Sequence, residues 1–200
     1  NCEVCQPCKS GMSQVCDAPK IIGTRVNGGY SDHVIIPDKK FLIDFTGINP
    51  HLACTLSCSG LTVYSALKKI NLGVLTEKDR LVIIGAGGLG LAAISIAKFL
   101  TKAKLIVVDI DNAKLKVAQE IGADFTVSST IDKPQDKIFD FVSSDTGVAA
   151  CLDFVGITQT MALGLSVLRK GGTHIHVGLH GGAHEISLPP LSFRMLKIIG

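Results

Sequence analysis

The chain has 200 residues, of which 46% are apolar and 18% charged, so it can build a packed core and is too apolar for an intrinsically disordered protein. The formal net charge is only +3 and the lysines are scattered, so we expect no nucleic-acid-binding surface. The 21 glycines follow no three-residue period, which excludes a collagen. The sequence starts with Asn and places four of its seven cysteines in the first 16 residues, so we expect a piece of a longer chain.

The four early cysteines have the spacing C-x2-C-x2-C-x7-C, in a segment without hydrophobic periodicity. Four thiolates this close in sequence suit a closed tetrahedral zinc site, which folds a loop that has no core of its own. A ferredoxin-type iron–sulfur run fits the first three cysteines, but the fourth spacing is too long, and Asp17 stands where that pattern has Pro. Tight spacing disfavours disulfides, and the scarcity of basic and aromatic neighbours disfavours a nucleic-acid-binding zinc ribbon. The predicted ligands of a structural zinc are Cys2, Cys5, Cys8 and Cys16.

Residues 21–80 are predicted to combine turns with one strand and one helix. Loose alternation over 30–37 predicts the strand, apolar positions at helical spacing predict a helix over 50–70, and 71–80 is typical of a polar connection. From residue 81 onward, short apolar runs alternate with helical stretches, which is typical of βαβ units and a parallel sheet buried on both faces. The predicted strands are 81–84, 105–108, 125–127, 151–155, 172–177 and 197–199. The predicted helices are 89–100, 112–121, 133–143 and 159–168.

The longest apolar run, 81–97, has the length of a short membrane span. Four glycines interrupt it, so a strand, a tight turn and a helix explain it better, and we expect no membrane segment. The cysteine cluster suits a reducing compartment better than an oxidising one. We therefore expect the protein to be in the cytoplasm.

The turn within this run carries G-x-G-x-x-G, directly after a predicted strand and at the start of a predicted helix. Gly85 would allow the tight turn, Gly87 would let the backbone approach a pyrophosphate, and Gly90 would let the helix pack closely on the strand. Free N–H groups near Gly88 and Leu89 would face the phosphates at the helix start. The alternative is a tight strand–helix turn that binds no ligand.

An acidic residue, Asp109, ends the second predicted strand, 24 residues after Gly85. A carboxylate there can accept both ribose hydroxyls of NAD and would repel the 2′-phosphate of NADP. Lys114, one helical turn further on, is a candidate for the ribose edge, with a solvated helix lysine as the alternative. The sequence therefore predicts an α/β fold with a Rossmann doubly wound parallel sheet that binds NAD.

These features occur together with further motifs. Residues 28–34 read G-G-Y-S-D-H-V, 56–67 read L-S-C-S-G-L-T-V-Y-S-A-L, 152–156 read L-D-F-V-G, and 177–179 read V-G-L. In this order, and over essentially all 200 residues, the chain resembles the zinc-dependent medium-chain alcohol dehydrogenases, of the NAD-dependent bacterial and yeast-like tetrameric type.

The resemblance implies that 1–55 is part of a GroES-like, β-rich catalytic domain with a structural zinc lobe, and that 56–200 is a C-terminally incomplete NAD-binding Rossmann domain. It implies that Cys58 is a ligand of a catalytic zinc, that Thr62 lies against the nicotinamide, and that Val177 and Gly178 border it. It further implies a homodimer or homotetramer that converts a small-molecule alcohol to an aldehyde or ketone.

The catalytic zinc site depends on the resemblance and is incomplete in this chain. From the residues alone, Cys58 would be interpreted as a buried helix cysteine, like Cys54 and Cys151. The family's other catalytic ligands include a His in a G-H-E motif that this chain lacks, so we expect the 200-residue segment to be inactive. The alternatives are another polyol, threonine or formaldehyde dehydrogenase, or a non-catalytic NAD-binding module. None of the six histidines is expected to replace the missing ligands, namely His33, His51, His174, His176, His180 and His184.

Overall fold

The computed structural model describes residues 1–142 and 146–200, which form two compact units, Asn1–Gly47 and Ile48–Gly200. The first unit contains the cysteine cluster, and the second contains the glycine-rich turn. The expected boundary after residue 55, with a catalytic part before it and a cofactor domain after it, stays a prediction.

The first unit, Asn1–Gly47, is fully described and holds little regular structure. Its only buried residue is Cys16, and its only strand pairing is an isolated bridge between Ile22 and Val26. The strand predicted over 30–37 is wrong, because a strand needs a neighbour for its backbone hydrogen bonds and this unit offers none there. Its helical turns are α1 (Gln6–Lys9), η1 (Ser13–Val15) and η2 (Lys39–Phe41).

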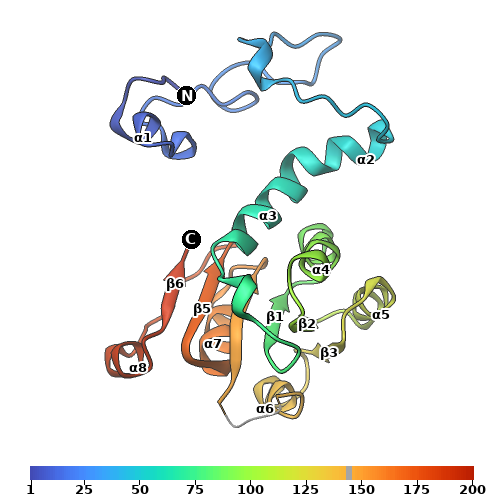
Figure 1. Cartoon of the computed structure of the whole chain (residues 1–200), viewed down its shortest axis with the longest axis vertical. Coiled ribbons are helices and arrows are strands. Elements are labelled where there is room, and N and C mark those ends of the chain that lie inside the picture. The colour runs from blue at the N-terminus through green and yellow to red at the C-terminus, as the bar shows by residue number, and fades with distance from the viewer. Residues whose placement is uncertain (143–145) are drawn as a thin grey trace. The chain divides into compact units, whose positions relative to one another are not determined.

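The second unit is built on a parallel sheet with the strand order β3-β2-β1-β4-β5-β6 in the described part of the chain (Figure 1). Its parallel strand pairings confirm the predicted α/β fold with a parallel sheet. Leu81 pairs with Leu105 on one side and with Ala150 on the other, so β1 lies at the centre, and the chain runs outward from it in both directions. The strands are β1 (Arg80–Ile84), β2 (Lys104–Asp109), β3 (Phe125–Ser128), β4 (Val148–Asp153), β5 (Leu168–His176) and β6 (Lys197–Ile199).

Helices cover both faces of this sheet, which explains why β1, β2 and β4 are apolar at most of their positions. Leu81 and Ile83 of β1 pack toward α3, α4 and α5, while Val82 and Ile84 pack toward α6 and α7. The helix predicted over 133–143 is shorter than expected, and its predicted last residue lies outside the described residues. The helices are α3 (Leu61–Lys68), α4 (Gly88–Leu100), α5 (Asn112–Ile121), α6 (Pro134–Phe139), α7 (Thr158–Val167) and α8 (Leu188–Phe193).

The helix predicted over 50–70 forms with an irregularity in its middle. It consists of α2 (Pro50–Thr55), a π-helical turn η3 (Leu56–Gly60) and α3, and a short 3₁₀ turn η4 (Leu72–Val74) follows. A π-helical turn inserts an extra residue per turn and frequently marks functional sites. This one carries the cysteine for which the family resemblance implies zinc binding.

The apolar run 81–97 forms β1, the glycine turn and most of α4, as predicted. Among the described residues, no helix has both the length and the apolar character that crossing a membrane requires.

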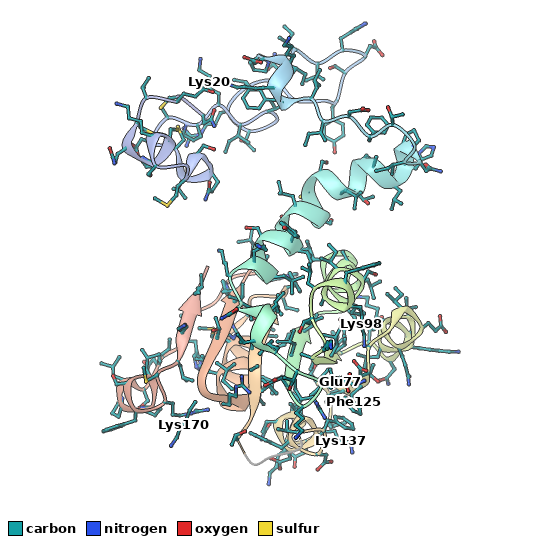
Figure 2. The ribbon with its side chains drawn as sticks, viewed as in Figure 1. Lys20, Glu77, Lys98, Phe125, Lys137 and Lys170 are labelled. Carbon is teal, nitrogen blue, oxygen red and sulfur yellow. The ribbon has the colours of Figure 1, made fainter. Side chains whose placement is uncertain are left out.

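A carboxylate joins α4 to the sheet beside this run. The Nζ atom of Lys98 on α4 (Figure 2) lies 2.6 Å from Oδ2 of Asp124, and Lys104 Nζ lies 3.2 Å from Oδ1. The backbone N–H of Leu105 also donates to Oδ2 of Asp124, at 2.8 Å. These contacts connect α4, β2 and the turn before β3.

Candidate cofactor site and zinc lobe

The glycine turn follows the central strand at the point where the chain's direction across the sheet reverses. Ligands of open α/β sheets bind at such a switch point, outside the carboxyl ends of the strands. Gly85 has a φ of +98°, which favours glycine, and its N–H donates to the carbonyl of Val108 on β2 at 2.8 Å. A Cβ on Gly90 would overlap the carbonyl oxygen of Gly85 and lie 2.8 Å from its carbon, so only glycine lets α4 start this close.

Gly87 and Gly88, the other two glycines of the turn, lie next to open space and not next to protein atoms. A Cβ on Gly87 or on Gly88 would meet no protein atom within 4 Å, so neither glycine is required by packing. No side chain caps the N-terminus of α4, which leaves the N–H groups of Gly88 and Leu89 without a helical partner. An uncapped helix start beside open space is the arrangement that holds phosphate groups.

Asp109 lies directly beside this turn. Its Oδ2 accepts the N–H of Ala86 at 2.6 Å, and its Oδ1 accepts the N–H of Asp111 at 2.9 Å. The half-buried carboxylate is therefore fixed at the carboxyl edge, between the glycine turn and the start of α5. Lys114 is exposed on the first turn of α5, where its ammonium group can extend into solvent.

The loops after β4 and β5 complete this edge of the sheet. The N–H of Gly178 donates to the carbonyl of Asp153 at 2.9 Å, and the N–H of Gly181 donates to that of Gly156 at 3.0 Å. Val177 is half-buried and Gly178 is buried. An open cavity of about 500 Å³ lies beside these loops, lined in part by Gly156, Met161, His176, Gly178 and His184.

The two candidates from the 50–70 helix lie on its irregular part. Cys58 is exposed within η3, and Thr62 is half-buried on the first turn of α3. Cys54 is exposed as well, whereas Cys151 is fully buried. The interpretation of Cys58 and Cys54 as buried helix cysteines is therefore wrong, because both are exposed. Cys151 is buried as expected, but it lies on strand β4 and not on a helix. Both η3 and α3 pack against α4, the helix that begins at the glycine turn.

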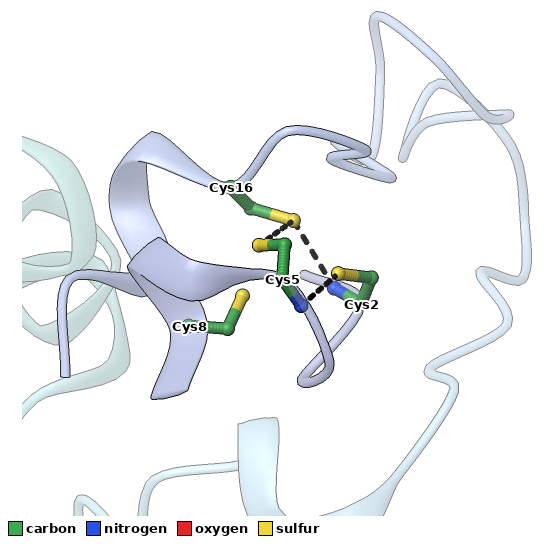
Figure 3. A group of neighbouring side chains, drawn as sticks. All are labelled: Cys2, Cys5, Cys8 and Cys16. Carbon is green, nitrogen blue, oxygen red and sulfur yellow. Dashed lines mark hydrogen bonds between the residues drawn. The ribbon is translucent and has the colours of Figure 1, made fainter. Parts of the chain in front are cut away.

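The four cysteines of the first unit converge (Figure 3). Their Sγ atoms all lie within 4.8 Å of one another, and the Sγ atoms of Cys5 and Cys16 are 3.9 Å apart. A tetrahedral zinc with Zn–S bonds of about 2.3 Å places its sulfurs about 3.8 Å apart. All four cysteines have free thiols, so the spacing and the geometry fit zinc.

Hydrogen bonds distribute charge unevenly in this cluster. The backbone N–H groups of Val4 and Cys5 lower the pKa of the Cys2 thiol to about 6. Desolvation and the neighbouring Cys5 sulfur raise the pKa of Cys8 to about 12. The protein groups alone therefore stabilise one thiolate and disfavour another. A divalent cation at the centre would supply the positive charge that four thiolates require.

The structure also assembles a polar group that the sequence patterns did not indicate. Asp153, His174 and His176 bring their ligand atoms within 4.8 Å of one another. Burial lowers the pKa of His174 to about 4, against the opposing charge of Asp153. The alternation of His174 and His176 on one strand was visible in the sequence, but the pairing of their strand with that of Asp153 was not.

Comparison with known proteins supplies the family. The family model described as "Zinc-binding dehydrogenase" matches residues 88–200. The chain is 37% identical, over 186 residues, to an NAD-dependent alcohol dehydrogenase of Sulfolobus acidocaldarius, covering 92% of this chain and 52% of that protein. It is 26% identical, over 206 aligned positions, to an L-threonine 3-dehydrogenase of Francisella tularensis, covering 100% of this chain and 57% of that protein.

The fold is shared with solved structures. The alcohol dehydrogenase from the hyperthermophilic archaeon Aeropyrum pernix superimposes with a TM-score of 0.83 at 26% identity, covering 99% of this chain and 57% of that chain. The chain thus spans about half the length of the curated relatives it matches. It belongs to the zinc-binding dehydrogenase family, the zinc-dependent medium-chain alcohol dehydrogenases that its motifs resemble.

Proposed function

We propose that this protein is an NAD-dependent zinc alcohol dehydrogenase, which reversibly transfers hydride from a primary or secondary alcohol to NAD and yields an aldehyde or ketone. One observation carries the proposal: the uncapped start of α4 lies beside open space, and the carboxylate of Asp109 is fixed next to it. The relative from Sulfolobus acidocaldarius, an NAD-dependent alcohol dehydrogenase, supports the same function.

In this proposal the glycine turn binds the pyrophosphate. Gly85 and Gly90 shape the turn, Gly87 leaves room for the phosphates, and the N–H groups of Gly88 and Leu89 donate to them. Asp109 accepts the ribose hydroxyls and sets the preference for NAD over NADP. Lys114 reaches the ribose edge from α5, while Val177 and Gly178 border the nicotinamide.

Two zinc sites belong to the proposal. Cys2, Cys5, Cys8 and Cys16 hold a structural zinc, and Cys58 is one ligand of a catalytic zinc, with Thr62 positioning the nicotinamide ring. When bound, the catalytic zinc supplies a Lewis acid that lowers the pKa of the alcohol. The exposure of Cys58 keeps its thiol accessible to such an ion.

The partners follow from this assignment. The substrate is a small-molecule alcohol, and we propose a homodimer or homotetramer in the cytoplasm, where thiol ligands stay reduced. A second candidate is oxidation of an amino alcohol such as threonine, which the 26% identity to the Francisella enzyme favours.

Fluorescence titration with NADH and NADPH tests the cofactor assignment. We expect the wild-type chain to bind NADH more tightly, because the 2′-phosphate of NADPH would lie against the Asp109 carboxylate. Asp109→Asn keeps an acceptor for the N–H of Ala86 and removes the charge. It should weaken NADH binding by roughly tenfold or more, because a hydrogen bond to a charged group contributes about that much to affinity. It should also narrow the preference for NADH over NADPH.

The matched control is Asp132→Asn, which changes an exposed carboxylate on the loop after β3. It should leave both affinities unchanged. A ratio of NADH to NADPH affinity that is the same in the wild type and in Asp109→Asn would overturn the assignment of Asp109.

A further inference from the structure

A buried polar cluster lies between β4, β5 and α7, on the face of the sheet where α7 packs. Cys151 pairs with His174 and Asp153 pairs with His176 across the two parallel strands. Alternate residues of a strand point to the same face, so these side chains share one face. A Cβ on Gly164 of α7 would lie 2.5 Å from Nδ1 of His174 and 3.0 Å from Sγ of Cys151, which identifies the face as the one that α7 covers.

The two imidazoles of this cluster are not satisfied by other protein groups. His174 is fully buried, and neither its Nδ1 nor its Nε2 has a hydrogen-bond partner within the described structure. Nδ1 of His176 is also buried and unpartnered there. An unpaired buried polar atom costs about 1–3 kcal/mol, so three of them at one place call for a ligand.

The third side chain is fixed by its neighbours. Oδ1 of Asp153 accepts the N–H groups of Val155 and Gly156, both at 2.9 Å, and Oδ2 accepts the hydroxyl of Thr160 at 2.7 Å. Oδ2 therefore keeps one lone pair free. Hydrogen bonds that orient a carboxylate in this way are typical of the groups around a metal site.

We propose that Asp153, His174 and His176 bind a divalent transition-metal ion, with Zn²⁺ as the expected occupant. Their ligand atoms all lie within 4.8 Å of one another and would have to approach to about 3.3 Å to bind a tetrahedral zinc. Two imidazole nitrogens and one carboxylate oxygen suit zinc, and they leave a fourth position open.

The proposed site borders a cavity. His176 is half-buried and lines the cavity of about 500 Å³ at the carboxyl edge, whereas Asp153 and His174 are fully buried behind it. An ion would therefore enter from the side of His176. The site uses neither the four cysteines of the first unit nor Cys58 as ligands. It does not depend on the proposed alcohol dehydrogenase activity.

Zinc content after equilibration with excess zinc sulfate and desalting tests the site. The wild-type chain should hold one more zinc per molecule than His176→Gln. Because the cysteine lobe is intact in both proteins, the difference reports only the new site, whether or not the lobe binds zinc. His184→Gln changes another histidine of the same cavity, outside the cluster, and should keep the wild-type zinc content.

Nitrogen NMR of the histidine rings in the wild-type chain provides a second measurement that needs no variant. Zinc should shift the ring resonances of His174 and His176 and leave those of exposed His33 unchanged. Equal zinc content in folded wild type and His176→Gln, or unchanged His174 and His176 ring resonances at saturating zinc, would overturn the proposal.

Discussion

The substitution Gly87→Ala separates a glycine turn that binds a cofactor from one that serves only the fold. The backbone of Gly87 has φ −80° and ψ −165°, extended values that alanine adopts without strain. The added Cβ would meet no protein atom within 4 Å. Alanine also restricts the unfolded chain, so we expect the free energy of unfolding to stay equal or rise by up to about 1 kcal/mol.

The same methyl group would occupy the space that the pyrophosphate needs. Forcing a methyl group into a close contact costs about 1–3 kcal/mol, which corresponds to a roughly 5- to 150-fold weaker affinity for NADH. The assays are thermal unfolding, where the midpoint should rise by no more than about 4 °C, and NADH fluorescence titration.

Two other glycines serve as controls. Gly73→Ala introduces the same methyl group on η4, also with no atom within 4 Å. It should leave the NADH affinity unchanged, and its free energy of unfolding should likewise stay equal or rise by up to about 1 kcal/mol. Gly90→Ala forces a methyl group onto the carbonyl of Gly85 and should destabilise the fold by more than about 2 kcal/mol. Unchanged NADH affinity in Gly87→Ala would refute the reasoning, because the open space would then not be the phosphate site.

Three further outcomes are expected. Cys8→Ser should lower zinc content by one per chain and lower the unfolding temperature, and an unaltered melting temperature with full zinc content would contradict the zinc lobe. Burial alone would raise the pKa of Asp124, but hydrogen bonds from Lys98, the N–H of Leu105 and Lys104 outweigh it and lower the pKa. Asp124 therefore stabilises the fold above about pH 4 and loses this effect as the pH falls through its folded-state pKa. The free energy of unfolding, measured in urea, should consequently decrease less on acidification in Asp124→Asn than in the wild type. The 200-residue chain should not reduce NAD with any alcohol, because Cys58 is the only one of the expected catalytic zinc ligands that it contains. Measurable NADH formation would contradict this prediction.

The centre of the sheet was predictable because its strands are buried on both faces. The central strands are therefore largely runs of apolar residues, such as Leu81–Ile84 within β1, and helices with recognisable boundaries follow several of them. Asn112–Ile121 is an example, since Asp111 caps its start and Gly122 ends it.

Two local sequence signals gave wrong predictions. Alternation over 30–37 looks like a strand, but no neighbouring strand pairs with it in the first unit. Helix α8 (Leu188–Phe193) was missed because Pro189 and Pro190 are typical helix breakers, although proline is tolerated in the first turn.

In the candidate site, too, some features were predictable from the local sequence and others were not. The glycine turn and Asp109 were predicted from one continuous motif and its spacing. The grouping of Asp153 with His174 and His176 was not, because it requires the register between β4 and β5. Cys58 lies on a π-helical turn, which helical periodicity does not reveal.

The most direct test of cofactor binding at the glycine turn is NMR titration of the wild-type chain with NADH, following the backbone amides. We predict saturable shifts at Gly87, Gly88 and Leu89, at the start of α4, together with Ala86, whose N–H donates to Asp109. Absence of binding, or saturable shifts confined to residues away from the glycine turn, would contradict this assignment.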